Sequence, residues 1–135
     1  MIEVTEEALV NDEKTANEVI HRLRELGVRV WLDDFGAGWC GLSTVRDLAV
    51  DGLKVDRSFV SRIHRDPASQ AITAAIVDIG HRLDIQVVCE GVEEPDEVDV
   101  LRAMQVQFLQ GYLFCKPMLP SDLQTYLQYH SPFLR

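Results

Sequence analysis

The sequence predicts an α/β fold of about five βα units, arranged as part of a (β/α)₈ TIM-like barrel. Short apolar runs alternate with longer stretches of helical periodicity, which is typical of a parallel sheet. Most of the runs end in a charged or polar residue, and in a (β/α)₈ barrel the carboxyl ends of the strands meet at the rim that carries the chemistry. A complete barrel needs about 250 residues. This chain has 135, so we expect part of a barrel.

Five apolar runs are the expected strands. They are Ile2–Val4, Val28–Leu32, Gly52–Val55, Ile85–Cys89 and Phe108–Phe114. We expect a set of side chains on these strands to face the inside of the barrel, and to be open to water if the barrel is incomplete. This set is Val4, Val30, Leu32, Val55, Val87 and Phe108.

Helices are expected between the strands, because apolar residues recur there at spacings of three and four. Turn and capping residues mark several of their ends, such as Gly27 after the first and Pro67 before the second. The expected helical stretches are 16–26, 42–48, 68–83, one opened by Pro95 and one capped by Ser121. No Pro/Gly/Ser-rich linker divides the chain, so residues 1–135 are expected to form a single unit.

Composition excludes several classes of protein. The net charge of −9 argues against a surface for duplex DNA or RNA. No stretch approaches 18 consecutive apolar residues, so we expect no membrane span and, without an apolar segment near the N-terminus, no secretory signal. The three cysteines, Cys40, Cys89 and Cys115, lack the spacing of a zinc site. Free thiols in a reducing cytoplasm are therefore expected.

Acidic residues at the expected strand ends suggest a metal site. Asp33 and Asp34 are adjacent, and Glu3 and Glu90 end two other strands. Carboxylates held together are costly to desolvate, and a dication such as Mg²⁺ or Mn²⁺ would offset that cost. Lys54 would then lie near a phosphate. Any one of these acids alone could equally be a helix cap or a solvated loop residue. The hypothesis of a metal site therefore rests on the repetition of acids across several strands.

Five motifs follow one another at the expected strand ends. They are Glu3-Val4-Thr5-Glu6, Asp33-Asp34-Phe35-Gly36-Ala37-Gly38, Leu53-Lys54-Val55-Asp56-Arg57-Ser58-Phe59-Val60, Glu90-Gly91-Val92-Glu93 and Gln110-Gly111-Tyr112-Leu113-Phe114. Taken in this order, they resemble the motifs of EAL domains. The similarity runs from residue 2 to about residue 123. It implies strands four to eight of a modified barrel that hydrolyses cyclic-di-GMP to linear pGpG with Mg²⁺ or Mn²⁺.

The resemblance also implies roles for single residues. Glu3, Asp33, Asp34 and Glu90 are similar to metal ligands, and Lys54 and Glu90 to the residues that act on the attacking water or the phosphate. A further set is similar to residues that support the substrate or the site. It comprises Glu6, which resembles the anchor of the loop 34–42, together with Asp56, Glu93 and Gln110.

The sequence also departs from the family pattern. No Glu-Ala-Leu tripeptide with the family's following arginine occurs in the chain, since Glu7-Ala8-Leu9 is followed by Val10-Asn11, and nothing matches the asparagine ligand of strand three. The loop segment Trp39-Cys40-Gly41 replaces the usual aromatic-small-serine run. We therefore expect the isolated chain to be weakly active or inactive, and its open barrel to be completed by dimerisation, element swapping or opening of the sheet. The alternative is a non-catalytic regulatory module that binds cyclic-di-GMP or a protein.

Overall fold

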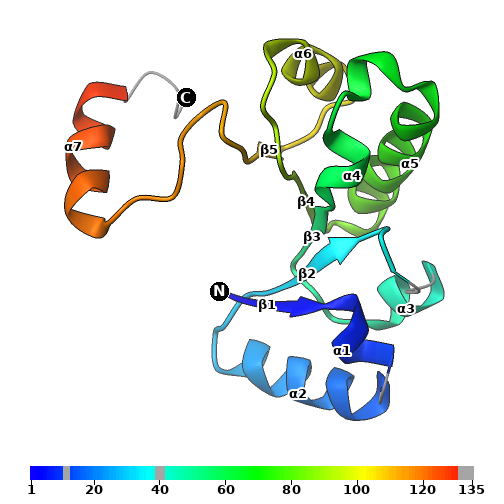
Figure 1. Cartoon of the computed structure of the whole chain (residues 1–135). Helices are drawn as coiled ribbons and strands as arrows, with labels where there is room; N and C mark the ends of the chain where they lie inside the picture. The colour runs from blue at the N-terminus through cyan, green and yellow to red at the C-terminus, as the bar shows by residue number, and fades with distance from the viewer. Residues whose placement is uncertain (11–12, 39–41, 131–135) are drawn as a thin grey trace.

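A computed structural model describes residues 1–10, 13–38 and 42–130 (Figure 1). Its centre is a five-stranded sheet in the order β1-β2-β3-β4-β5, with every neighbouring pair parallel. The strands are β1 (Ile2–Thr5), β2 (Val30–Phe35), β3 (Gly52–Val55), β4 (Gln86–Cys89) and β5 (Phe108–Leu109). Sequential strands that are neighbours and parallel are the arrangement of a barrel wall. The predicted α/β fold with about five βα units is confirmed.

Helices connect the strands. They are α1 (Glu6–Val10), α2 (Glu13–Glu25), α3 (Leu42–Asp47), α4 (Arg57–Val60), α5 (Pro67–Leu83), α6 (Pro95–Ala103) and α7 (Pro120–His130), with a 3₁₀ turn, η1, at Ile63–Arg65. The short helices α1 and α4 were not expected. Each follows directly on a strand, and the Asp56 side chain caps α4 by accepting from the Ser58 N–H at 2.9 Å. None of the helices in the described residues is long and apolar enough to cross a membrane.

One face of the sheet packs against the helices and forms the core. Apolar side chains of α2, α5 and α6, such as Ile20, Ile76 and Leu101, lie there. The strand residues that they meet are Val30, Leu32, Leu53, Val55 and Val87, all of them fully buried. The expectation that Val30, Leu32, Val55 and Val87 face the inside of the barrel is therefore wrong.

The opposite face carries the residues that alternate with this core set. Side chains of a strand point alternately to the two faces, and residues paired across parallel strands share a face. Trp31 pairs with Gly52, and its ring lies where a Cβ at Gly52 would be. Phe108, paired with Val88, is 47% exposed, as expected for this face. Val4 pairs with Leu32 and packs against the core, so it also belongs to the helix side, contrary to expectation.

The last expected strand is shorter than predicted. β5 ends at Leu109, and the chain turns at Gly111, where the Phe114 N–H donates to the Gly111 carbonyl at 3.1 Å. A Cβ at Gly111 would collide with the backbone of Val92. Only glycine can make this approach, and the strand pattern of 108–114 therefore breaks there.

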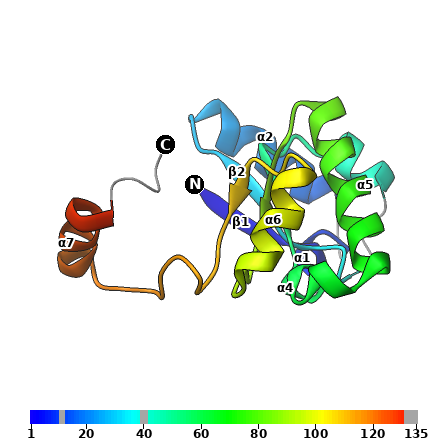
Figure 2. The same ribbon diagram turned by 90° about the horizontal axis from the view of Figure 1, so that it is seen from above.

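The helix α7 lies away from the sheet at the end of an extended segment (Figures 1 and 2). The Tyr126 hydroxyl donates to the Phe114 carbonyl at 2.8 Å, which ties the helix to that segment. Apolar side chains along this region, among them Leu119, Leu123 and Leu127, are exposed. The described part of the chain therefore leaves an apolar side of α7 uncovered.

Candidate metal centre

Lys54 is the centre of a cluster at the carboxyl ends of the strands. Its Nζ lies 3.0 Å from Glu3 Oε1, 2.8 Å from Asp33 Oδ1 and 2.8 Å from Glu90 Oε1. The three carboxylates come from β1, from β2 and from the residue that follows β4, while the lysine comes from β3. Four adjacent strands thus contribute one charged group each.

The sheet register explains this convergence. Thr5 pairs with Asp33, and Lys54 pairs with Val88, which places Asp33, Lys54 and the position of Glu90 on the face opposite the core. Glu3 lies two residues before Thr5 and shares that face. Because parallel strands run in the same direction, their ends place these side chains together at one edge of the sheet.

The lysine is buried among these acids. Its side chain is 9% exposed, against 21% for Asp33 and 18% for Glu90. Burial alone would lower the pKa of Lys54, but the contacts with Asp33, Glu90 and Glu3 outweigh it and raise the pKa above its usual range. The lysine is therefore charged at any physiological pH and neutralises part of the carboxylate cluster.

Asp34 joins the site through an irregularity of the strand. The pairing of β2 with β3 shifts register between Leu32 and Phe35, and Asp34 has the left-handed φ of 56°. Consecutive strand residues normally face opposite sides, whereas here one carboxylate oxygen each of Asp33, Asp34 and Glu90 lies within 4.8 Å of the others. Bulges of this kind commonly redirect side chains beside active sites.

The protonation of Asp34 reflects its neighbours. Loss of hydration raises its pKa, and so do the charges of Asp33, Asp56 and Glu6, with only Lys54 opposing them. A cation placed among these oxygens would relieve the repulsion. An all-carboxylate donor set suits a hard ion such as Mg²⁺ or Mn²⁺, so the residues present fit the metal that the sequence led us to expect.

Glu6 lies under the loop that follows β2. It is 4% exposed, and its Oε1 accepts a hydrogen bond from the Gly36 N–H at 3.0 Å. A Cβ at Gly38 would collide with the same carboxylate. A cavity of about 230 Å³ lined by Thr5, Glu6, Asp34, Ala37 and Gly38 opens here. Glu6 thus contacts the start of this loop at Gly36 and Gly38. Residues 39–41, where the departure from the family pattern falls, lie outside the described residues.

The other predicted support residues contact groups other than Lys54. Glu93 Oε1 pairs with Arg57 Nη2 at 2.9 Å, and the backbone of Gln110 bonds to Cys89 and Val92. Asp56 caps α4, and its charge acts on Asp34. A second cavity, of about 200 Å³, is lined by Arg57, Glu90, Gly91, Glu93, Gln110, Gly111 and Tyr112. It adjoins the cluster through Glu90.

Two residues that sequence reasoning missed belong to this region. Arg57 lies beside the second cavity, and a Cβ at Gly91 would meet its side chain. Glu97, on α6, is almost fully buried and binds the backbone of the loop after β4. Pro95 followed by a glutamate at the third helical position is a capping signal that could have identified Glu97.

The chain matches the family model described as EAL domain over residues 1–117. The chain belongs to the EAL domain family. A probable cyclic di-GMP phosphodiesterase of Escherichia coli, PdeG, is 40% identical over 123 residues, which are 91% of this chain and 24% of that protein.

Solved EAL structures agree with the computed fold. The EAL domain of Mycobacterium smegmatis DcpA is 37% identical with a TM-score of 0.88, over 94% of this chain and 57% of that one. Klebsiella pneumoniae BlrP1, solved as a complex with manganese and cyclic-di-GMP, is 38% identical with a TM-score of 0.81, over 86% of this chain and 30% of that one. The chain thus spans a quarter of the curated relative and little more than half of the solved EAL domain.

Proposed function

We propose that this chain supplies the metal-binding and phosphate-facing part of an EAL site that hydrolyses cyclic-di-GMP to pGpG. The observation that carries the proposal is the meeting of Glu3, Asp33 and Glu90 around Lys54, with Asp34 turned toward the same acids. The manganese and cyclic-di-GMP complex of BlrP1, a relative with the same fold, supports the choice of ion and substrate.

In this proposal Glu3, Asp33, Asp34 and Glu90 hold Mg²⁺ or Mn²⁺. Such an ion would lower the pKa of a water and offset phosphate charge there. Lys54, which is charged and buried, is placed to donate hydrogen bonds to a phosphate oxygen or to the attacking water. Glu90 offers a carboxylate beside Lys54 that can accept the proton of that water.

The remaining residues hold this arrangement. Glu6 fixes the loop after β2 through the Gly36 N–H, and Asp56 caps the helix that follows Lys54. Glu93 and Gln110 line the cavity beside Glu90, where the body of the dinucleotide would lie. We propose that residues 1–135 act as one unit, in the reducing cytoplasm that suits the free thiols of Cys89 and Cys115.

Taken alone, these 135 residues are proposed to have little or no activity. A Glu-Ala-Leu motif with its following arginine, and the asparagine that the family resemblance implies, do not occur among them. The outer edges of β1 and β5 have no strand partner in the described residues. A second copy that covers these edges, as a dimer or by swapping, is part of the proposal.

The test compares the wild-type chain with Asp33→Ala and with Asp78→Ala, an exposed acid of α5 paired with Arg82. Mn²⁺ binding is measured by calorimetry, cyclic-di-GMP binding by calorimetry in the presence of Mn²⁺, and pGpG by chromatography. We expect Asp33→Ala to weaken Mn²⁺ binding at least tenfold, Asp78→Ala to change it less than twofold, and pGpG to stay near background. The metal site is contradicted if the wild type binds no Mn²⁺ or Asp33→Ala binds it equally well.

Two outcomes separate the alternatives. Rapid pGpG formation that Asp33→Ala abolishes would refute the low activity of the isolated chain but uphold the phosphodiesterase site. Tight binding of cyclic-di-GMP that neither Mn²⁺ removal nor Asp33→Ala affects would favour the non-catalytic regulatory module. Light scattering after size-exclusion chromatography tests the second copy, which a stable monomer would contradict.

A further inference from the structure

Glu97 is a buried carboxylate with no Lys or Arg ion-pair partner among the described residues. Its side chain is 2% exposed. Oε1 accepts from the Arg62 N–H at 2.7 Å, and Oε2 accepts from the N–H groups of Glu93 and Glu94 at 2.8 and 3.0 Å. Burial alone would raise the pKa of Glu97, but these three hydrogen bonds and the nearby His64 lower it.

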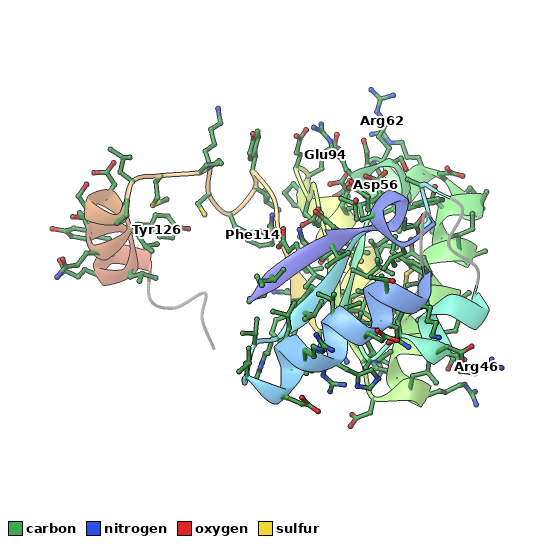
Figure 3. All side chains as sticks on the ribbon, turned by 90° about the horizontal axis from the view of Figure 1, so that it is seen from below. Arg46, Asp56, Arg62, Glu94, Phe114 and Tyr126 are labelled. Carbon is green, nitrogen blue, oxygen red and sulfur yellow. The ribbon has the colours of Figure 1, made fainter. Side chains whose placement is uncertain are left out.

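The three donors come from two different segments. Arg62 lies between α4 and η1, whereas Glu93 and Glu94 end the loop after β4. Figure 3 shows Arg62 and Glu94 at the same end of the molecule as Asp56. The bond from the Glu94 N–H belongs to the capping box of α6, in which Glu94 is the N-cap and Glu97 the third helical residue. The bond to Arg62, 35 residues away in the chain, is not part of a capping box.

The Arg62 bond holds a conformation that is costly by itself. Arg62 has a φ of 59°, which a residue with a side chain rarely adopts and which costs about 1 kcal/mol or more. A buried carboxylate is also costly unless its oxygens are hydrogen-bonded. The left-handed backbone of Arg62 and the buried carboxylate of Glu97 are each unfavourable alone, and the hydrogen bond between them offsets both costs. This bond therefore holds the junction between the segment 57–62 and the loop 90–94 in one geometry.

That junction is connected to the candidate metal centre through Arg57 and Gly91. Arg57, five residues before Arg62, pairs with the Glu93 side chain at 2.9 Å and packs against Gly91. Gly91 follows Glu90, whose carboxylate contacts Lys54. Glu97 therefore fastens the loop that carries Glu90 to the segment that follows the strand of Lys54.

We propose that Glu97 is a positioning residue that sets the placement of Glu90 relative to Lys54. It touches neither residue and acts through the loop 90–94 and the segment 57–62. The proposal deepens the proposed function, because the placement matters for a metal that Glu90 would hold. The fastening itself is a property of this chain whether or not a metal binds.

The test compares Glu97→Gln with Val98→Ala, the next residue on α6, which is buried in the core and makes no side-chain hydrogen bond. Glutamine keeps the shape, but one end of its amide is a donor and faces backbone N–H groups. The two variants are expected to lose comparable stability. The two readouts are the Mn²⁺ dissociation constant and the ¹⁵N–¹H spectrum of the metal-free chain, both recorded well below the unfolding temperature.

We expect Glu97→Gln to raise the Mn²⁺ dissociation constant by about tenfold, as for residues that orient metal ligands, and to shift the amide signals of Glu90, Gly91 and Arg57. Val98→Ala should change the constant less than twofold and leave those signals in place. If Glu97→Gln does not fold, Glu97→Asp, which keeps the charge but shortens the reach, is compared in the same way.

The proposal is overturned if the signals of Glu90 and Gly91 stay in place while only Arg62, Glu93 and Glu94 shift, or if Val98→Ala has effects equal to those of Glu97→Gln. An unchanged Mn²⁺ dissociation constant in Glu97→Gln overturns it as well. If the wild type binds no Mn²⁺, the proposed function fails, and the amide signals alone decide the role of Glu97.

Discussion

Replacing Lys54 by methionine is expected to destabilise the metal-free chain and to increase its response to Mn²⁺. Each of the three carboxylate contacts, at 2.8–3.0 Å, represents about 6 kcal/mol of Coulomb attraction at an effective dielectric constant of about 20. Desolvation of the ammonium offsets most of that sum. Removing one partner of a buried pair costs about 3–5 kcal/mol.

Solvent screening reduces this figure here. The Glu3 side chain is 40% exposed, so its contact contributes little. We therefore expect Lys54→Met to lower the free energy of unfolding by about 2–3 kcal/mol in EDTA. For a chain of this size that corresponds to roughly 6–12 °C in melting temperature. The repulsion left among Glu3, Asp33 and Glu90 is the physical cause.

Mn²⁺ should restore more stability to this variant than to the wild type. A ligand that binds only the folded state stabilises it by RT ln(1 + [L]/Kd), and the variant offers the same carboxylates without a competing ammonium. The assay is urea unfolding followed by circular dichroism, with EDTA and with Mn²⁺. Lys116→Met is the control, because Lys116 lies over the Tyr112 ring at 5.7 Å and its loss should cost less than about 1 kcal/mol.

Two results would refute this reasoning. One is a Lys54→Met chain that matches the wild type in EDTA, which would mean that the ammonium does not offset carboxylate repulsion. The other is an equal gain from Mn²⁺ in both chains, which would mean that the ion binds away from Lys54.

Two further predictions concern single side chains. The pKa of Glu97 is lowered on folding, so its stabilising effect is present above the ordinary glutamate pKa and is lost as pH falls through the lowered value. In unfolding curves between about pH 2 and 5, Glu97→Gln should therefore lose less stability with falling pH than the wild type. An unchanged profile would contradict the assignment. Gly111→Ala should cost several kcal/mol because its Cβ would meet the Val92 backbone, whereas Gly27→Ala, with φ of 78° and open space, should cost about 1 kcal/mol; equal midpoints in urea would show that the turn at Gly111 adapts.

The sequence was sufficient to predict which groups meet at the strand ends. Glu3, Asp33, Lys54 and Glu90 each lie in or directly after an apolar run, and parallel strands bring the ends of such runs together. The direction of the apolar side chains was predicted wrongly, because strands of a parallel sheet are apolar on both faces and their alternation is weak. The position of Asp33 would have given the correct direction. Val30 and Leu32 lie three residues and one residue before Asp33, so their side chains must point to the opposite face, which packs against the helices.

Other features depended on contacts between distant segments. The buried role of Glu97 requires the Arg62 N–H, which lies 35 residues away and has no sequence signature. The early end of β5 depends on Gly111 meeting Val92, an approach that the apolar pattern of 108–114 conceals. Asp34 turns toward Asp33 only because β2 shifts register against β3.

Lys54 of β3 pairs with acids from β1, from β2 and from the end of β4, and this restricts how the sheet can assemble. A slip of one residue in any strand would carry its charged group to the helix side, where Leu32, Val55 and Val87 are completely enclosed. A carboxylate there would have no counter-ion, and Lys54 would be left with fewer than three. Lys54 keeps all three of its ion pairs only when β1, β2 and β4 are in register with β3. A misaligned sheet therefore loses ion pairs as well as packing.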